Sequence, residues 1–146
     1  TVVNTYSSNG LKTLYLNSQY VKTYQLVNVS KNTEYQLSYD VYNPDGKYAN
    51  AIVFDSTRTK TINNTSVQTY GRSAWETVYT TFDSGDYESL RIEFQLSSAA
   101  AGVYIDNVKL EKAPLVKNGS FEKNYNDWSY SVKRYYFKCM LYLLII

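Results

Sequence analysis

The chain of 146 residues contains no histidine and a single cysteine, Cys139. Without histidine, a Ser-His-Asp triad, Cys-His catalysis and zinc sites with imidazole ligands are excluded. One cysteine cannot form an internal disulfide or a metal site built from several thiolates. Paired carboxylates could still hydrolyse a glycosidic bond, but no acidic pair stands in a distinctive sequence context. We therefore expect a noncatalytic protein.

The sequence also lacks a concentration of charge of one sign and a long hydrophobic run. It has 15 Lys and Arg against 13 Asp and Glu, a net charge of +2. The basic residues are scattered, whereas binding to nucleic acid favours a basic stripe, so no nucleic-acid partner is expected. The apolar run in the C-terminal "KRYYFKCMLYLLII" is shorter than the roughly 20 residues that span a bilayer, so no membrane span is predicted.

Tyrosine, by contrast, is abundant, with 17 residues beside many Asn, Ser and Thr. Tyr and Thr fit a pleated, half-buried surface, so this composition favours β structure. The clearest strand is "EYQLSYDVYN", in which apolar and polar residues alternate with the period of a strand. We predict that it is a central strand whose buried face carries Tyr35, Leu37, Tyr39 and Val41.

Similar short runs recur along the chain, and no stretch before residue 130 has a helical period. "AWETVYTTF", "LRIEFQL" and "VYIDNVKL" each alternate, and turn signals separate them. Residues 56–74 are polar and are expected to form a long loop with room for one short strand. Several short strands at near-regular spacing predict an all-β fold, an antiparallel β-sandwich or jelly roll.

The order of "YQLVNVSKNTEYQLSYDVYN", "AWETVYTTF", "LRIEFQL" and "GVYIDNVKL" resembles the family 4 and 9 carbohydrate-binding modules, over residues 5–112. These modules are galactose-binding-like jelly rolls attached to bacterial polysaccharide-degrading enzymes and surface proteins. The resemblance implies a noncatalytic module of a secreted or cell-surface bacterial protein, often joined to glycoside hydrolases. Its partner would be a polysaccharide or a cell-surface glycan. The alternative is a jelly-roll spacer or adhesion module of a surface protein or toxin that binds a protein.

The opening strand of such modules resembles "LVKNGSFE", which stands here at the end of the chain. We interpret residues 1–112 as a module lacking its first strand and 113–131 as the opening of a following module in a tandem array. Residues 132–146 form an apolar tail typical of a fragment or a frameshift artefact, with a hydrophobic anchor as the alternative. The chain begins with Thr1 and no signal-peptide pattern, which favours an internal piece of a longer protein.

The displaced opening strand could instead belong to the same module that precedes it. "VKNGSFE" could fold back as a hairpin onto Val103–Leu110 and fill the vacancy in its own module, with Phe121 buried. The chain would then be a monomer. Donation of the strand to another copy would give oligomers, and disorder of 115–146 is the remaining alternative. The resemblance also implies a structural calcium between the carboxylates of Asp106 and Glu122, completed by backbone carbonyls of the Ser8–Lys12 turn.

Sugar recognition relies on exposed aromatic rings and on planar polar side chains beside them. The outward rings on the predicted strands are Tyr42 and Tyr79. Their outward polar neighbours are Gln36, Asp40, Arg91, Glu93 and Gln95. If their strands share one sheet, these residues form a single binding wall. Otherwise they are the ordinary solvated faces of a sandwich.

Overall fold

The computed structural model describes residues 1–19, 22–44, 48–68, 74–96 and 102–114. The chain divides into two compact units, Thr1–Ala113 and Pro114–Ile146, and only Pro114 of the second unit is described. The predicted fold-back strand, the burial of Phe121, the Glu122 ligand and the tail 132–146 therefore lie outside the described residues.

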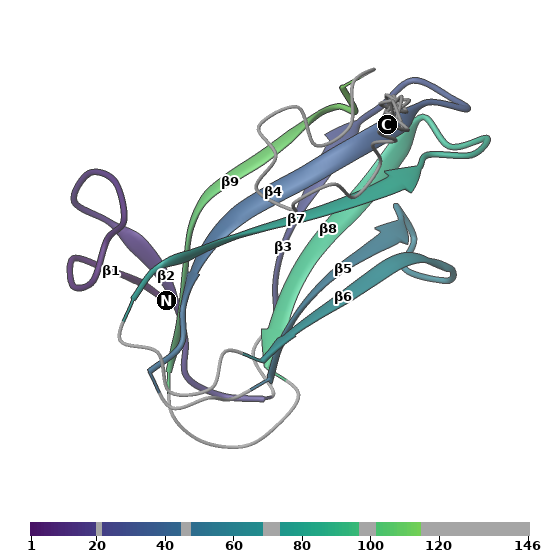
Figure 1. Ribbon diagram of the computed structural model, residues 1–146. Helices are drawn as coiled ribbons and strands as arrows, with labels where there is room; N and C mark the ends of the chain where they lie inside the picture. The colour runs from purple at the N-terminus through teal and green to yellow at the C-terminus, as the bar shows by residue number, and fades with distance from the viewer. Residues whose placement is uncertain (20–21, 45–47, 69–73, 97–101, 115–146) are drawn as a thin grey trace, which may run out of the picture. The chain divides into compact units, whose positions relative to one another are not determined.

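The described residues form two antiparallel sheets packed face to face (Figure 1). One sheet has the order β1-β2-β9-β4-β7 and the other β3-β8-β5-β6. The strands are β1 (Val2–Val3), β2 (Thr13–Leu16), β3 (Lys22–Asn28), β4 (Glu34–Tyr42), β5 (Tyr48–Asp55), β6 (Thr61–Gln68), β7 (Glu76–Asp83), β8 (Ser89–Leu96) and β9 (Val103–Lys112). The predicted all-β antiparallel sandwich is confirmed. Among the residues described, no helix is long and apolar enough to cross a membrane.

Strand β4 has the predicted position and register. It pairs with β7 on one side and β9 on the other. Its alternate side chains are buried, with exposed fractions of 8% for Tyr35, 0% for Leu37, 2% for Tyr39 and 0% for Val41. A shift of one residue would put the polar set in the core, so this alternation fixes the register.

The opposite sheet contributes its own alternate residues to the core. Its inward side chains are Ala49, Ala51 and Val53 of β5 and Leu90, Ile92, Phe94 and Leu96 of β8. The Tyr39 ring meets the Phe94 ring edge to face, with centroids 5.1 Å apart and an interplanar angle of 77°. This contact joins the two inner faces and leaves Arg91, Glu93 and Gln95 on the outer face of β8.

Residues 61–68 form a longer strand than the short one that the prediction allowed within the loop 56–74. They form β6, an eight-residue strand paired with β5 from Thr61 opposite Phe54 to Gln68 opposite Tyr48. The segment "TINNTSVQ" has few apolar residues because β6 is the last strand of its sheet, where little of it needs to enter the core. The backbone pairing, rather than the side-chain pattern, defines this strand.

Candidate functional site

The residues predicted to bind carbohydrate lie on two different sheets. Gln36, Asp40 and Tyr42 lie on β4 and Tyr79 on β7, both in the five-stranded sheet, whereas Arg91, Glu93 and Gln95 lie on β8 in the four-stranded sheet. The condition of a shared sheet is therefore not met, and the residues do not form a single wall, because the two groups point away from opposite layers. We call them the Tyr42 surface and the Glu93 surface.

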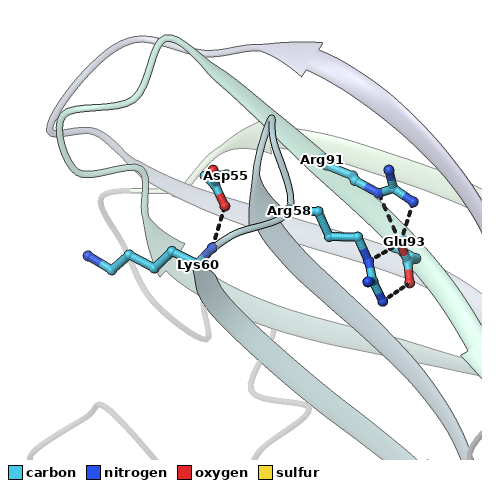
Figure 2. Close-up of polar contacts among 5 residues, drawn as sticks. All are labelled: Asp55, Arg58, Lys60, Arg91 and Glu93. Carbon is cyan, nitrogen blue, oxygen red and sulfur yellow. Dashed lines mark hydrogen bonds and ion pairs between the residues drawn. The ribbon is translucent and has the colours of Figure 1, made fainter.

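The centre of the Glu93 surface is a carboxylate held by two arginines (Figure 2). Arg58 donates from Nε to Glu93 Oε2 at 3.1 Å and from Nη2 to Oε1 at 3.2 Å. Arg91 donates from Nε to Oε2 at 2.9 Å, with its Nη2 at 2.6 Å from the same oxygen. The Glu93 side chain is 0% exposed, so both guanidinium groups are fixed by a fully buried charge.

Burial alone would raise the pKa of Glu93, because a carboxylate is poorly solvated there. The hydrogen bonds and positive charges of Arg58 and Arg91 outweigh this effect and hold the pKa below its usual value. Glu93 is therefore ionised near neutral pH and carries no proton to donate. Such a carboxylate organises its neighbours but is unsuited to general acid catalysis.

Arg58 reaches this surface from the turn between β5 and β6, which Asp55 holds in place. The Asp55 carboxylate accepts hydrogen bonds from the hydroxyls of Thr57 and Thr59 and from the backbone N–H of Lys60. The hydrogen bond from Thr57, followed by that from Lys60, lowers the pKa of Asp55 well below its usual range. Arg58 adopts a positive φ of 63° in this turn, and its side chain reaches Glu93 of β8.

Aromatic rings lie against both arginines. The Arg58 guanidinium stands 5.0 Å from the centre of the Phe54 ring, and that of Arg91 stands 3.4 Å from the centre of the Tyr24 ring. Phe54 is buried, whereas Tyr24 is 53% exposed. A guanidinium over a ring is attracted by the electron density of the ring face, so the contact with Arg91 favours one orientation of the exposed Tyr24 ring.

An unpaired amide completes the Glu93 surface. Asn50 of β5 lies opposite Gln95 of β8, and its buried Oδ1 has no hydrogen-bond partner among the described residues. A buried polar atom without a partner is uncommon in folded proteins and calls for an explanation. The Asn50 side chain lies on the outer face of the four-stranded sheet, but neighbouring side chains cover this oxygen.

Three members of this surface, Tyr24, Asn50 and Arg58, were not among the predicted residues. The alternation of β3 could have identified Tyr24 as outward, because Thr23 and Val27 occupy the other face. Nothing in the local sequence distinguishes Arg58, since its position depends on the turn that Asp55 organises. Asn50 could not be identified from the sequence, because only the structure reveals that its side-chain oxygen lacks a hydrogen-bond partner among the described residues.

On the Tyr42 surface the aromatic rings cover one another. Tyr42 stacks on Tyr6 at 5.2 Å and contacts Trp75 at 5.7 Å, while Tyr104 stacks on Tyr15 at 4.7 Å. These ring faces are therefore largely occupied by other rings. Two rings remain more than half exposed, Tyr6 at 58% and Tyr79 at 51%, and Tyr79 lies opposite Ser38 of β4.

The carboxylates of the Tyr42 surface already accept hydrogen bonds from neighbouring side chains. The Ser8 hydroxyl lies 2.8 Å from Asp40 Oδ2 and 3.2 Å from Asp106 Oδ2, and the Asn107 amide donates to Asp40 at 2.8 Å. Burial would raise the pKa of both carboxyl groups. The hydrogen bonds they accept, from Thr77, Asn107 and Ser8 at Asp40, hold the pKa of each below its usual value.

The predicted calcium site can be compared with the oxygens around Ser7. Its hydroxyl lies 2.9 Å from the Asn9 carbonyl, 3.5 Å from the Lys12 carbonyl and 3.0 Å from Asp106 Oδ2. Ca²⁺ prefers carboxylate and carbonyl oxygens, but these three oxygens surround the Ser7 hydroxyl itself, and Glu122 lies outside the described residues, so the calcium site stays a prediction. In the described ranges, no group of three or more His, Cys, Asp or Glu side chains is placed so that it could hold a metal ion.

No protein-family model matches this chain, and no curated protein matches its sequence. Solved structures do have similar folds. A CBM4 carbohydrate-binding module matches with a TM-score of 0.58 and 17% identity over 67% of this chain and 64% of its own. The CBM22-1 xylan-binding domain of Paenibacillus barcinonensis Xyn10C matches with a TM-score of 0.58 and 17% identity over 77% of this chain and 81% of its own.

A third similar structure is TmCBM61 in complex with β-1,4-galactotriose, with a TM-score of 0.61 and 15% identity over 77% of this chain and 81% of its own. The chain spans less than two thirds of the CBM4 structure. At such identities the likeness concerns the fold alone. The chain has the jelly-roll fold found in carbohydrate-binding modules, as predicted.

Proposed function

We propose that this chain is a noncatalytic carbohydrate-binding module of the family 4 and 9 type that binds a polysaccharide on the Glu93 surface. The observation that carries the proposal is the buried carboxylate of Glu93 between the guanidinium groups of Arg58 and Arg91, beside the exposed ring of Tyr24. The carbohydrate-binding modules of similar fold support it.

The charged network is costly to bury, which favours a role in binding. A buried ion pair is often no more stabilising than apolar residues of the same volume, because both charges lose their hydration. Here the network holds planar N–H donors on an outer face. Glu93 occupies only part of the donor capacity of each guanidinium, so the remaining N–H groups can donate to sugar hydroxyls without first being ordered.

Tyr24 would supply the apolar contact. The C–H groups of a pyranose ring stack on an aromatic face, and a ring already oriented by Arg91 loses little conformational freedom on binding. The Gln95 amide, on the outer face of β8, can then accept hydrogen bonds from hydroxyls and donate to them. The Tyr42 surface is less suitable, because most of its rings stack on one another and its carboxylates already accept hydrogen bonds from neighbouring side chains.

The proposal also includes the location of the protein and the domains attached to it. A module of this kind would act outside a bacterial cell or at its surface, and it would keep an attached glycoside hydrolase at its polymer by raising the local concentration. The ionised Glu93 fits a binding role better than an acid–base one. Each of these statements depends on the glycan being bound.

Affinity electrophoresis in gels containing soluble glucan, xylan or galactan tests the proposal. We expect at least one polymer to retard the wild-type chain, and Tyr24→Ala to weaken retention about tenfold, a loss within the range for an aromatic contact. Tyr79→Ala, which removes an equally exposed ring from the opposite sheet, is the matched control and should be retained like wild type. A folded chain that no polymer retards would contradict the proposal.

A further inference from the structure

The outer face of the four-stranded sheet carries an excess of positive charge. Lys22 of β3 lies opposite Gln95 of β8, and residues paired in this way point to the same face of a sheet. Lys22 therefore shares the outer face with the side chains of Arg58, Arg91 and Glu93 (Figure 2). These four side chains carry three positive charges and one negative charge, so two positive charges remain uncompensated.

The outer face of the five-stranded sheet is acidic instead. The pairing of β4 with β7 and β9 shows which charged residues share that face with Asp40. They are Glu34, Asp83, Asp106, Lys109 and Glu111. With Asp40, five carboxylates stand against one ammonium group on this face. An anionic polymer is therefore attracted to one side of the sandwich and repelled by the other.

The arginines of the basic face keep N–H groups that Glu93 does not use. A guanidinium has five N–H donors, and Glu93 accepts only from Nε and Nη2 of Arg58 and lies within ion-pair distance of the same two atoms of Arg91. The Arg58 side chain is 38% exposed and that of Arg91 is 17% exposed. Arg58 in particular can therefore donate to a second acceptor from solvent.

A carboxylate is the acceptor that fits these donors best. Its two oxygens lie in one plane and match the planar fork of a guanidinium, and such charged hydrogen bonds are stronger than those to neutral hydroxyls. Glu93 already binds Arg58 in this way, through both oxygens. Because the Glu93 side chain is 0% exposed and offsets only one of the two guanidinium charges, it leaves the surface attractive to a second carboxylate.

We infer that the glycan bound on the Glu93 surface carries uronic acid residues, whose carboxylates accept hydrogen bonds from Arg58 and are attracted by Lys22. This inference rests on the proposed function, since it names the class of polymer bound at the same site. The ring of Tyr24 and the amide of Gln95 serve neutral sugars equally well. A polymer without carboxylates would therefore bind in the same place, but more weakly.

Affinity electrophoresis with matched polymers tests the inference. Polygalacturonate, alginate and glucuronoxylan are each compared with their carboxyl-reduced forms, in which the uronic acids have become neutral sugars on the same backbone. We expect at least one acidic polymer to retard the wild-type chain about tenfold more strongly than its reduced form at low salt, the effect of one hydrogen bond to a charged group. High ionic strength should diminish this difference.

Two outcomes separate this inference from the proposed function. Retention of the chain by the reduced polymers that equals or exceeds retention by the acidic ones would overturn the inference and leave carbohydrate binding intact. No retention of the folded chain by any polymer, acidic or neutral, would contradict both.

A pair of lysine variants locates the attraction on one face. Lys22→Glu reverses an exposed charge on the basic face and should weaken retention by the acidic polymer about fivefold, as expected for one exposed charge pair. Lys109→Glu makes the same change at an exposed position of the opposite sheet and should leave retention close to that of the wild-type chain. Equal losses in the two variants would show that net charge alone governs binding, and would overturn the inference.

Discussion

The guanidinium carbon of Arg91 lies 3.4 Å from the centre of the Tyr24 ring, while its Nε donates to the buried carboxylate of Glu93 at 2.9 Å. An exposed aromatic ring is thus connected through one guanidinium to a fully buried charge. The ring cannot move freely without disturbing the ion pair. This contact makes the outer face of the four-stranded sheet a preorganised surface. A substitution at Glu93 should therefore also change the environment of the Tyr24 ring.

Replacing Glu93 with Gln should destabilise the protein strongly. The substitution leaves Arg58 and Arg91 side by side without their shared carboxylate, and breaking a buried pair in this way costs about 3–5 kcal/mol. The free energy of unfolding in urea measures the effect. Glu88→Gln, which alters an exposed pair with Lys31, should change it by less than about 1 kcal/mol, and equal losses in the two variants would refute the buried-network description.

Leu37→Ala tests the packing of the central strand. Leu37 is 0% exposed on β4, so its truncation should lower the free energy of unfolding by about 2–5 kcal/mol through cavity formation. Leu11, which is 83% exposed, serves as the control, and its replacement by Ala should have little effect. A neutral Leu37→Ala would mean that the register of β4 is incorrect.

The alternation of β4 and β8 allowed the sequence to predict which residues are buried, because both strands are interior and their inner faces are uniformly apolar. Strand β6 was expected only as a short strand within a long loop, because an edge strand needs few apolar residues. The grouping of Tyr42 with Arg91 failed for another reason. Membership of a sheet is decided by pairing between distant strands, and the alternation within a strand shows which face a residue is on but not to which sheet the strand belongs.

Stability should fall as the solution becomes acidic. The pKa values of Asp40, Glu93 and Asp106 are all lowered in the folded protein, so each carboxylate contributes stability above its unfolded pKa. That contribution is lost as the pH falls through the lowered folded value. Thermal unfolding should therefore show a decreasing melting temperature below about pH 4. A melting temperature that rises on acidification would contradict these shifts.

Calcium should raise the melting temperature if the oxygens around Ser7 hold the ion. Asp106 and the carbonyls of Asn9 and Lys12 converge there, and an ion that binds only the folded state stabilises it. We expect a higher melting temperature in millimolar Ca²⁺ than in EDTA, and no such difference in Asp106→Ala. An identical melting temperature of the wild-type chain in both solutions would exclude the site.

The most direct test of carbohydrate binding on the Glu93 surface is a titration with a soluble oligosaccharide of the retained polymer, followed by amide chemical shifts of the full chain. The largest changes are expected at Tyr24 on β3, Asn50 on β5 and Glu93 on β8. Changes centred instead on Tyr42 and Tyr79, on the opposite sheet, or no changes at saturating ligand, would contradict the assignment of the binding surface.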